Sequence, residues 1–376
     1  MNKDKWCIFH VPNYIDPAVK SGSQVRPLKM VQAFKALGYN VDVVMGYGKE
    51  RRKQINRIKS EIKGGKKYEF VYSESSTMPT LLTEKRHLPL FPLLDFGFLA
   101  YCKRNGMKIG LFYRDMHWKF EGYKLKVPFR KRIVAIPFYK YDLKKYEKIA
   151  DVLYLPSERM RPLLNGYKMK KIESLPPGAV YDAVIVEERK RYFKSREKEN
   201  LNIFYVGGVG GIYDLTGLFK ATVAVSNLRL IVCTRKEEWD SVKNKYGPYM
   251  NERIKIIHES GDALRKYYMQ ADLCCCYFPI SKYMSFAMPI KLFEYLSFAT
   301  PIIATKGMEA GNFVQKWNAG FSIDYDEHSI VELFKMINAN QGVLSEKNEN
   351  TITCLMENTW EERAKKVERD LKGERK

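Results

Sequence analysis

The chain has 376 residues, 45% of them hydrophobic, and a formal net charge of +22. A chain of this length usually divides into two cores, and its hydrophobic content excludes general disorder. No apolar run approaches the roughly 18 residues of a membrane-spanning helix, and Met1 to His10 lacks the apolar centre of a signal peptide.

The charge is unevenly distributed along the chain. Residues 1–200 hold 42 Lys and Arg against 21 Asp and Glu, whereas residues 201–376 hold 23 against 22. A basic half beside a neutral half predicts that the first half faces a polyanion.

The first half begins as a doubly wound α/β domain. A strand is expected at 6–11, followed by a loop with Ser21-Gly22-Ser23, a helix from about 24 to 37 and a strand at 40–45. Further strands are predicted at 70–72, 108–113 and 152–155. The order strand, glycine loop, helix, strand is typical of this fold class.

The same pattern starts again in the second half. It breaks near Pro176-Pro177-Gly178, and the charged stretch 187–200 predicts a linker or an exposed helix. Strands are then expected at 201–206, 228–233, 254–257, 273–277, 302–304 and 320–323. We predict domains at 1–180 and 201–356, a linker at 181–200, and a charged helix at 357–376 anchored by Trp360.

The segment Pro289–Leu296 carries two charged residues in an apolar, helix-patterned run. Proline suits the first position of a helix, and Lys291 and Glu294 then share one face near its start. Backbone N–H groups at that end favour an anion. The alternative is a surface ion pair that contributes roughly 0.2–0.5 kcal/mol.

A glycine loop, Gly207-Gly208-Val209-Gly210-Gly211, follows a predicted strand and precedes a predicted helix. Such a loop lets backbone N–H groups approach a phosphate, although tight turns also need glycine for steric reasons. The spacing does not fit a nicotinamide-cofactor site. Arg235 follows the strand at 228–233, where it is either a ligand contact or a solvated loop residue.

Seven cysteines are present without metal-ligand spacing, and Cys274-Cys275-Cys276 fit a buried strand. We expect no metal, no disulfide and no cofactor.

Several motifs together resemble the GT-B glycosyltransferases, family 4 in particular. The resemblance is carried by Val206-Gly207-Gly208, by Tyr268-Met269-Gln270-Ala271-Asp272, by Pro289–Leu296, and by Pro301-Ile302-Ile303-Ala304-Thr305. Ser21-Gly22-Ser23, Arg26-Pro27, Pro176-Pro177-Gly178 and the Trp360 helix also look like that group. It implies two Rossmann-like domains facing across a cleft, with the last helix crossing back to the first domain.

The resemblance also implies site roles. A nucleotide-sugar donor would be held by the second domain, with Glu294 on the ribose hydroxyls, Lys291 and Arg235 near the diphosphate, and the backbone of Gly207, Gly208, Gly210 and Gly211 approaching it. Many relatives have a glutamate eight positions before Glu294, where this chain has Phe286. Retention of the anomeric configuration is the first expectation, and this departure leaves inversion open.

In the first domain, Asp115 and His117 follow a predicted strand at a place that looks like the family's catalytic position. Either is a candidate general base, and a structural role for both is the alternative. His10 is a weaker candidate. Gly22, Ser23 and Arg26 are expected to hold the acceptor, with Arg26 on a phosphate.

Residues 118–148 contain ten Lys or Arg, three Asp or Glu and eight aromatic residues. This mixture suits an anionic membrane surface, although nucleic acid or an ordinary solvated face are alternatives. No RNA-binding signature accompanies it. The predicted membrane-facing residues are Trp118, Lys124, Lys126, Arg130, Lys131 and Arg132.

The leading hypothesis is a glycosyltransferase of the hexosyl type, bound peripherally to the inner face of the plasma membrane. It would extend a polyprenyl-diphosphate-linked saccharide, as in capsule, exopolysaccharide or O-antigen assembly. The alternatives are a nucleotide-sugar 2-epimerase of the same architecture and a non-catalytic basic protein that binds nucleic acid.

Overall fold

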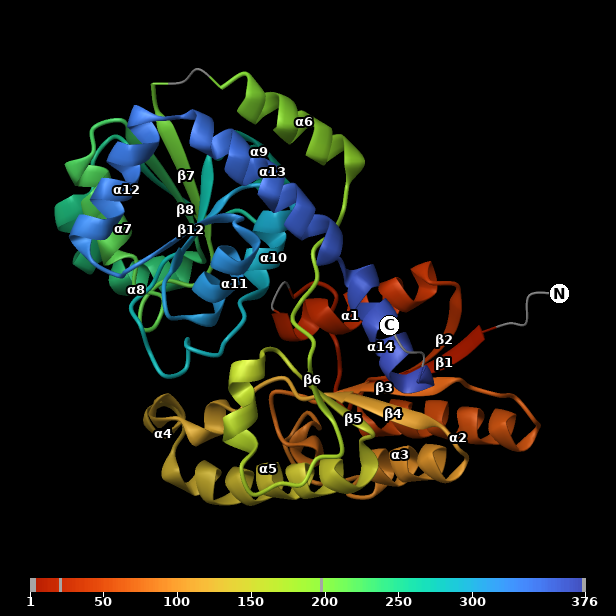
Figure 1. Cartoon of the computed structure of the whole chain (residues 1–376). Coiled ribbons are helices and arrows are strands. Elements are labelled where there is room, and N and C mark those ends of the chain that lie inside the picture. The colour runs from red at the N-terminus through yellow and green to blue at the C-terminus, as the bar shows by residue number, and fades with distance from the viewer. Residues whose placement is uncertain (1–4, 20–21, 197–198, 374–376) are drawn as a thin grey trace. The chain divides into compact units, whose positions relative to one another are not determined.

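A computed structural model describes residues 5–19, 22–196 and 199–373; Ser21 of the first loop motif lies outside these ranges. The chain divides into two compact units, each with its own sheet (Figure 1). Unit 1 comprises Met1–Pro177 and Trp360–Lys376, and unit 2 comprises Gly178–Thr359.

Unit 1 contains a parallel six-stranded sheet with the strand order β2-β1-β3-β4-β5-β6. Its strands are β1 (Lys5–His10), β2 (Tyr39–Val44), β3 (Phe70–Glu74), β4 (Lys108–Phe112), β5 (Val152–Leu155) and β6 (Ile172–Ser174). Every residue of β3 and β5 is buried. This follows from the topology, because crossover helices cover both faces of a parallel sheet.

The helices of unit 1 lie in two layers. Figure 1 shows α1 and α14 on one face of the sheet and α2, α3 and α5 on the other. The elements are α1 (Gly22–Ala36), α2 (Gly48–Lys63), α3 (Leu94–Arg104), α4 (Glu121–Lys126), α5 (Phe129–Ile149) and α14 (Trp360–Lys372), with short 3-10 turns η1 (Thr80–Leu82), η2 (His117–Lys119) and η3 (Glu158–Leu164). The C-terminal helix α14 packs on α1, β3 and β4, as the resemblance implied.

Unit 2 repeats this design with the strand order β12-β11-β10-β7-β8-β9, again all parallel. Its strands are β7 (Leu201–Val206), β8 (Leu228–Cys233), β9 (Ile254–Ile257), β10 (Leu273–Cys276), β11 (Ile302–Thr305) and β12 (Gly320–Ile323). The three consecutive cysteines lie on the central strand β10 and are fully buried, as small hydrophobic side chains would be.

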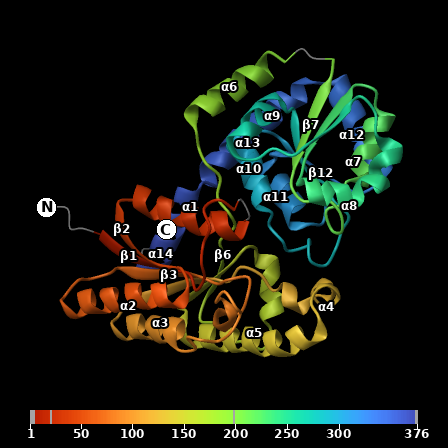
Figure 2. The same ribbon diagram turned by 180° about the vertical axis from the view of Figure 1, so that it is seen from behind.

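Helices again cover both faces of this second sheet. The two opposite views agree that α7, α8 and α12 lie on one side and α9, α10 and α13 on the other (Figure 2). The elements are α6 (Ala183–Lys194), α7 (Thr216–Ala224), α8 (Lys236–Tyr246), η4 (Gly247–Tyr249), η5 (Gly261–Leu264), α9 (Arg265–Gln270), α10 (Ile290–Ser297), α11 (Glu309–Trp317), α12 (Glu327–Ala339) and α13 (Gly342–Glu357). The predicted α/β class with two doubly wound sheets is therefore confirmed.

The predicted linker at 181–200 differs from the structure. Residues 183–194 form α6, which packs on α13 and belongs to unit 2. Arg189 is fully buried there, and its guanidinium donates to the carbonyls of Met269 and Ala271. The charged composition concealed this burial, because an arginine can be buried when backbone carbonyls accept hydrogen bonds from its N–H groups.

In the described part of the chain, no helix is long and apolar enough to cross a membrane.

The start of β12 gives a test of strand packing. Gly320 has φ of 142°, and an added Cβ would lie 2.0 Å from the carbonyl oxygen of Ile302 on the neighbouring strand. We expect Gly320→Ala to lower the free energy of unfolding by at least about 2 kcal/mol. Chemical denaturation measures this change.

Gly342→Ala is the matched control in the same unit. It stands at the start of α13, and its added Cβ would meet only the end of the Asn340 side chain, at 3.2 Å. That variant should be at least as stable as the wild type. Equal unfolding curves for both variants would contradict the packing described for β12.

Candidate functional site

Helix α10 is anchored over the carboxyl ends of two neighbouring strands of unit 2. It follows Pro289, and its buried face is formed by Leu292, Phe293, Tyr295 and Leu296. The Tyr295 hydroxyl lies 3.3 Å from the Val206 nitrogen, the Val206 carbonyl oxygen and the Cys275 carbonyl oxygen. Tyr295, in the last turn of α10, therefore ties this helix to the carboxyl ends of β7 and β10, the sheet edge at which open α/β folds bind ligands.

Lys291 and Glu294 form an ion pair on the partly exposed side of this helix. Lys291 Nζ lies 2.8 Å from Glu294 Oε2, and the side chains are 27% and 35% exposed. The Tyr268 hydroxyl donates to the same oxygen at 3.3 Å. Burial raises the pKa of the Cys233 thiol at the end of β8, and a hydrogen bond to the Glu259 carbonyl and the positive charge of Lys291 oppose that rise.

The glycine loop turns sharply at the end of β7. Gly210 and Gly211 have φ of 91° and 59°, a conformation that glycine adopts without strain. The N–H of Gly207 donates to Cys233 O, and that of Gly210 donates to Tyr213 O. In the described part of the chain, the N–H groups of Gly208 and Gly211 have no protein acceptor, so these two remain for a ligand.

Arg235 is held by an acid that the sequence analysis did not single out. Its guanidinium lies 2.8 Å from Glu238 Oε1, and its side chain is 69% exposed. The other Glu238 oxygen accepts from Thr234 Oγ1 and would lie 3.3 Å from a Cβ at Gly208. A carboxylate thus stands beside the glycine loop, and Arg235 compensates its charge.

Asp115 and His117 lie together after β4 in unit 1. His117 Nδ1 is 3.5 Å from Asp115 Oδ2, and both side chains are partly exposed. The imidazole also contacts the Tyr139 hydroxyl at 3.3 Å through Nε2, and the Tyr123 ring packs edge-on at 5.3 Å. A carboxylate beside an imidazole is an arrangement that can accept a proton.

Arg26 differs from its predicted role on an acceptor phosphate. It is 3% exposed, donates to Glu74 Oε1 and lies over the Phe112 ring at 3.5 Å. Arg114, which is less deeply buried, donates to the other Glu74 oxygen at 3.0 Å and reaches the carbonyl of Gly22 at 3.4 Å. The buried Glu74 carboxylate therefore orients both arginines, and Arg114 is the one nearer the surface; Ser23, one residue into α1, is partly buried.

Trp118, predicted to face a membrane, is buried. Its exposed fraction is 5%, its ring stacks on Tyr139 at 5.3 Å, and its Nε1 donates to the Tyr113 hydroxyl. Since a buried ring cannot enter a lipid surface, that prediction is wrong for Trp118. The residues Lys124, Lys126, Arg130 and Lys131 are exposed as predicted, and Arg132 is half-buried.

Exposed apolar side chains stand among these basic residues. Leu125 on α4 is 84% exposed, and Phe129, Ile133 and Val134 at the start of α5 are more than half exposed. A second exposed group, Leu88, Leu90 and Leu93, occupies the loop between η1 and α3. Both η1 and α3 pack on α5, and both α3 and α5 begin at the carboxyl edge of a parallel sheet, so the two groups belong to the same end of unit 1.

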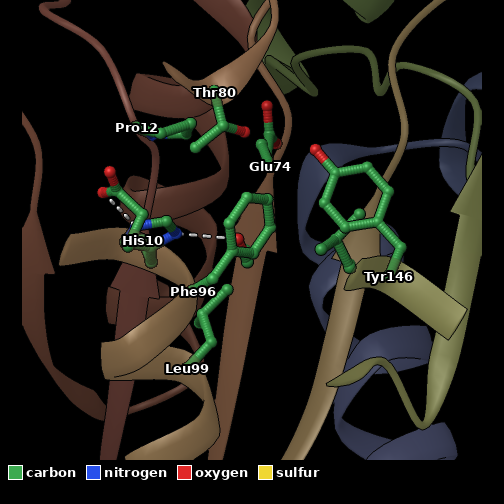
Figure 3. Close-up of a pocket in the computed structure, with 10 residues that line it drawn as sticks. His10, Pro12, Glu74, Thr80, Phe96, Leu99 and Tyr146 are labelled. Atoms are coloured by element: carbon green, nitrogen blue, oxygen red, sulfur yellow. Dashed lines mark hydrogen bonds and ion pairs between the residues drawn. The ribbon is translucent and has the colours of Figure 1, made fainter. Parts of the chain in front are cut away.

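His10 lies in a buried polar cluster of unit 1, beside a cavity of about 10 Å³ (Figure 3). Its Nδ1 is 2.8 Å from Ser73 Oγ and its Nε2 is 3.0 Å from Asp95 Oδ1. Arg51 pairs with Asp95 at 2.9 Å. With His10 only 2% exposed and a cavity large enough for about one water, this cluster is structural.

Two buried carboxyl groups near this cavity have pKa values that are shifted in opposite directions. Burial favours a higher pKa for Asp95, but hydrogen bonds from His10 and Arg51 and their charges lower it below its usual value. Asp142 has no cation among the described residues, and burial raises its pKa to about 7. Its Oδ2 accepts from the Thr80 N–H at 2.8 Å, while Oδ1 has no partner there.

In the described part of the chain, no three His, Cys, Asp or Glu side chains are grouped as metal ligands would be. All seven cysteines are free and buried.

The fold defined by these two units is that of the GT-B glycosyltransferases. No protein-family model and no curated protein matches the chain. Solved structures do match over nearly its whole length. A glycosyltransferase from Rickettsia africae has a TM-score of 0.64 at 12% identity and covers 99% of this chain and 100% of its own. HepE of Anabaena in complex with UDP has a TM-score of 0.61 at 11% identity and covers 98% and 100%.

Sucrose-phosphate synthase from Thermosynechococcus elongatus, with a TM-score of 0.60 at 14% identity, covers 96% of this chain and 97% of its own. These similarities establish the fold, and the resemblance to GT-B proteins predicted from the motifs is confirmed at that level.

The structure brings together Lys291 and Glu294 on α10, which is tied to the carboxyl ends of β7 and β10, and the glycine loop follows β7 at the same sheet edge. It adds Tyr268 and Glu238, which the sequence analysis missed. Tyr268 belongs to a motif used for the resemblance, but its contact with Glu294 spans 26 positions and leaves no local signal.

Asp142 predicts an unusual dependence of stability on pH. The folded protein keeps the Asp142 proton up to a pKa of about 7, whereas the ordinary value is 3.8, so the unfolded chain releases it first. Stability from this group is complete below pH 4 and is lost as the pH rises to 7. Between pH 5 and pH 8 the wild type should lose about 2.7 kcal/mol of unfolding free energy through this group, and Asp142→Asn should not show that loss.

Urea denaturation at both pH values measures this difference, with the exposed Asp240→Asn as the control. Parallel pH dependences for wild type and Asp142→Asn would show that Asp142 is ionised in the folded protein.

Proposed function

We propose that the chain is a glycosyltransferase that moves a sugar from a nucleotide-sugar donor to an acceptor hydroxyl. The observation that carries this proposal is the Lys291–Glu294 pair, held by α10 over the carboxyl ends of β7 and β10. The structural likeness supports it, because HepE was determined with UDP and with UDP-glucose.

Unit 2 binds the donor in this proposal. Glu294 accepts hydrogen bonds from the ribose hydroxyls, and Lys291 contributes positive charge to the diphosphate. The free N–H groups of Gly208 and Gly211 donate to phosphate oxygens. A departing nucleoside diphosphate gains negative charge in the transition state, and donors that are already oriented stabilise it.

Asp115 or His117 of unit 1 serves as the general base on the acceptor hydroxyl. Their separation of 3.5 Å allows the carboxylate to hold the imidazole in one orientation. The residue eight positions before Glu294 is a buried Phe286, so sugar contacts come from other groups. Retention of configuration remains the proposed outcome. It requires the acceptor hydroxyl to attack the face of the sugar from which the diphosphate departs, because attack on the opposite face inverts the anomeric carbon.

The acceptor is proposed to be a polyprenyl-diphosphate-linked saccharide at the inner face of the plasma membrane. We propose Arg114 in place of Arg26 for an acceptor phosphate, because its side chain is less deeply buried and its guanidinium reaches the carbonyl of Gly22 at the start of α1. Similarity to WaaG, a glycosyltransferase involved in lipopolysaccharide biosynthesis, supports surface polysaccharide as the product class.

The membrane contact is proposed for the basic and apolar surface formed by α4 and the start of α5. Leu125 and Phe129 are exposed apolar side chains that can enter the interface, while Arg130 and Lys131 meet anionic headgroups. The leucines at 88, 90 and 93 extend the apolar part of this surface. An anionic lipid surface therefore offers favourable contacts to both the apolar and the basic side chains.

Nucleotide binding tests the donor site. The wild type is tested in a thermal-shift panel of nucleoside diphosphates and nucleotide sugars. A ligand that binds should raise the melting temperature, because at 100 times its dissociation constant it adds about 2.7 kcal/mol to the free energy of unfolding. Glu294→Ala removes the ribose contact and should weaken affinity by roughly 10- to 100-fold.

The control is Glu332→Ala, which removes an i,i+3 partner of Lys335 at the same 2.8 Å distance on α12. It should respond like wild type. An unresponsive wild type, or a Glu294→Ala shift equal to that of wild type, would refute the donor site. Salt-sensitive oligonucleotide binding without any nucleotide response would favour the nucleic-acid alternative, and sugar isomerisation without transfer would favour the epimerase.

Liposome flotation tests the membrane surface. Wild type should bind phosphatidylglycerol vesicles and detach as salt increases. Replacing Arg130, Lys131 and Arg132 by Gln should weaken binding at least about tenfold, since each basic residue near the surface contributes up to about 1 kcal/mol. Leu125→Ser with Phe129→Ser should weaken it at every salt concentration.

Replacing Lys140, Lys144 and Lys148 by Gln is the matched control, because it removes the same charge from the other half of α5. Equal binding to neutral and anionic vesicles, or equal losses in the two triple variants, would contradict the proposed surface.

A further inference from the structure

Tyr268 is held rigidly behind the Lys291–Glu294 pair. It lies on α9 and is 3% exposed. Its ring stacks on Phe298 with centroids 4.2 Å apart and packs edge-on against Phe204 at 5.0 Å. These ring contacts fix where its hydroxyl points, independently of any hydrogen bond.

That hydroxyl is a permanent donor. Burial raises the pKa of Tyr268 well above its usual value, and the negative charge of Glu294 adds to the rise. The phenol therefore stays protonated at every working pH, and it donates to Glu294 Oε2 at 3.3 Å.

The two oxygens of Glu294 have different surroundings. Oε2 accepts from both Lys291 Nζ at 2.8 Å and the Tyr268 hydroxyl. Among the described residues, no protein donor reaches Oε1. Since two donors from different helices hold one oxygen, the carboxylate plane is restrained and the second oxygen remains available to a ligand.

We propose that Tyr268 is a positioning residue for the donor site, which sets the orientation of Glu294 so that Oε1 meets the ribose hydroxyls. This inference rests on the proposed function, and it adds a residue that does not itself contact the donor. Lys291 lies on the same helix as Glu294, so it cannot fix the carboxylate relative to the rest of the unit. Tyr268 belongs to α9 and holds the carboxylate from a separate element.

Tyr268→Phe removes the hydroxyl and keeps the ring, so it tests the contribution of the hydroxyl alone. Phenylalanine keeps the stacking on Phe298 and the edge contact with Phe204, so the variant is expected to fold. The loss of one donor to a carboxylate should weaken UDP binding about three- to tenfold. If the thermal-shift panel shows that the protein binds guanine nucleotides, GDP is used in these measurements in place of UDP.

The decisive measurement compares UDP with 2′,3′-dideoxy-UDP by isothermal titration calorimetry. Wild type should prefer UDP, because only UDP offers hydroxyls to Glu294. Tyr268→Phe should lose affinity for UDP and leave affinity for the dideoxy analogue unchanged, which reduces the preference by the same factor. In a Glu294→Ala background, adding Tyr268→Phe should change neither affinity.

Tyr246→Phe is the matched control, since this buried tyrosine of unit 2 directs its hydroxyl to Asp214 instead. It should keep the wild-type preference. Equal weakening of both nucleotides by Tyr268→Phe would show a merely structural role and overturn the inference.

The failures of the two proposals are distinguishable. Full UDP affinity in Glu294→Ala would refute the donor site itself. A weakened Glu294→Ala together with an unaffected Tyr268→Phe would refute only the positioning role.

Discussion

The candidate site depends on the way α10 is fastened to the sheet of unit 2. Tyr295 has no exposed surface, and its hydroxyl lies within hydrogen-bond distance of backbone groups on both β7 and β10. A helix of eight residues has little stability of its own, so it takes its position from such tertiary contacts. With the buried face fixed in this way, Lys291 and Glu294 must emerge at the carboxyl edge of the sheet. The glycine loop reaches the same edge because the strands are parallel.

Burial and pairing distinguish the structural charged side chains of unit 1 from the candidate functional ones. In unit 1, Arg51 pairs with Asp95, and Glu74 accepts from both Arg26 and Arg114. Each of these charges has a partner, as the burial of ions requires. Four of the groups are buried, whereas Arg114 is only partly buried. The basic residues of α4 and of the start of α5 are mostly exposed instead, next to apolar side chains that water does not favour. Part of the positive charge of the first half therefore resides at this exposed surface.

Much of the architecture could be predicted because hydrophobic strands, glycine turns and amphipathic helices follow local rules. The strands β1, β7, β8 and β10 lie within one residue of their expected positions. The errors arose where burial was decided by distant residues. The basic neighbours of Trp118 predict a surface position, yet its ring is buried and stacks on Tyr139 of α5. The charge of the stretch around α6 predicts a linker, yet the carbonyls of Met269 and Ala271 accept hydrogen bonds from the buried Arg189.

The sequence by itself determined the two parallel sheets, the glycine loop and the i,i+3 spacing of Lys291 and Glu294, because periodicity and turn chemistry act over a few residues. Only the tertiary structure decided which charged groups face a ligand. It buried Arg26 against Glu74 and brought the Tyr268 hydroxyl from α9 to Glu294. Such contacts join residues on separate elements, and their geometry exists only after the helices have packed on the sheet.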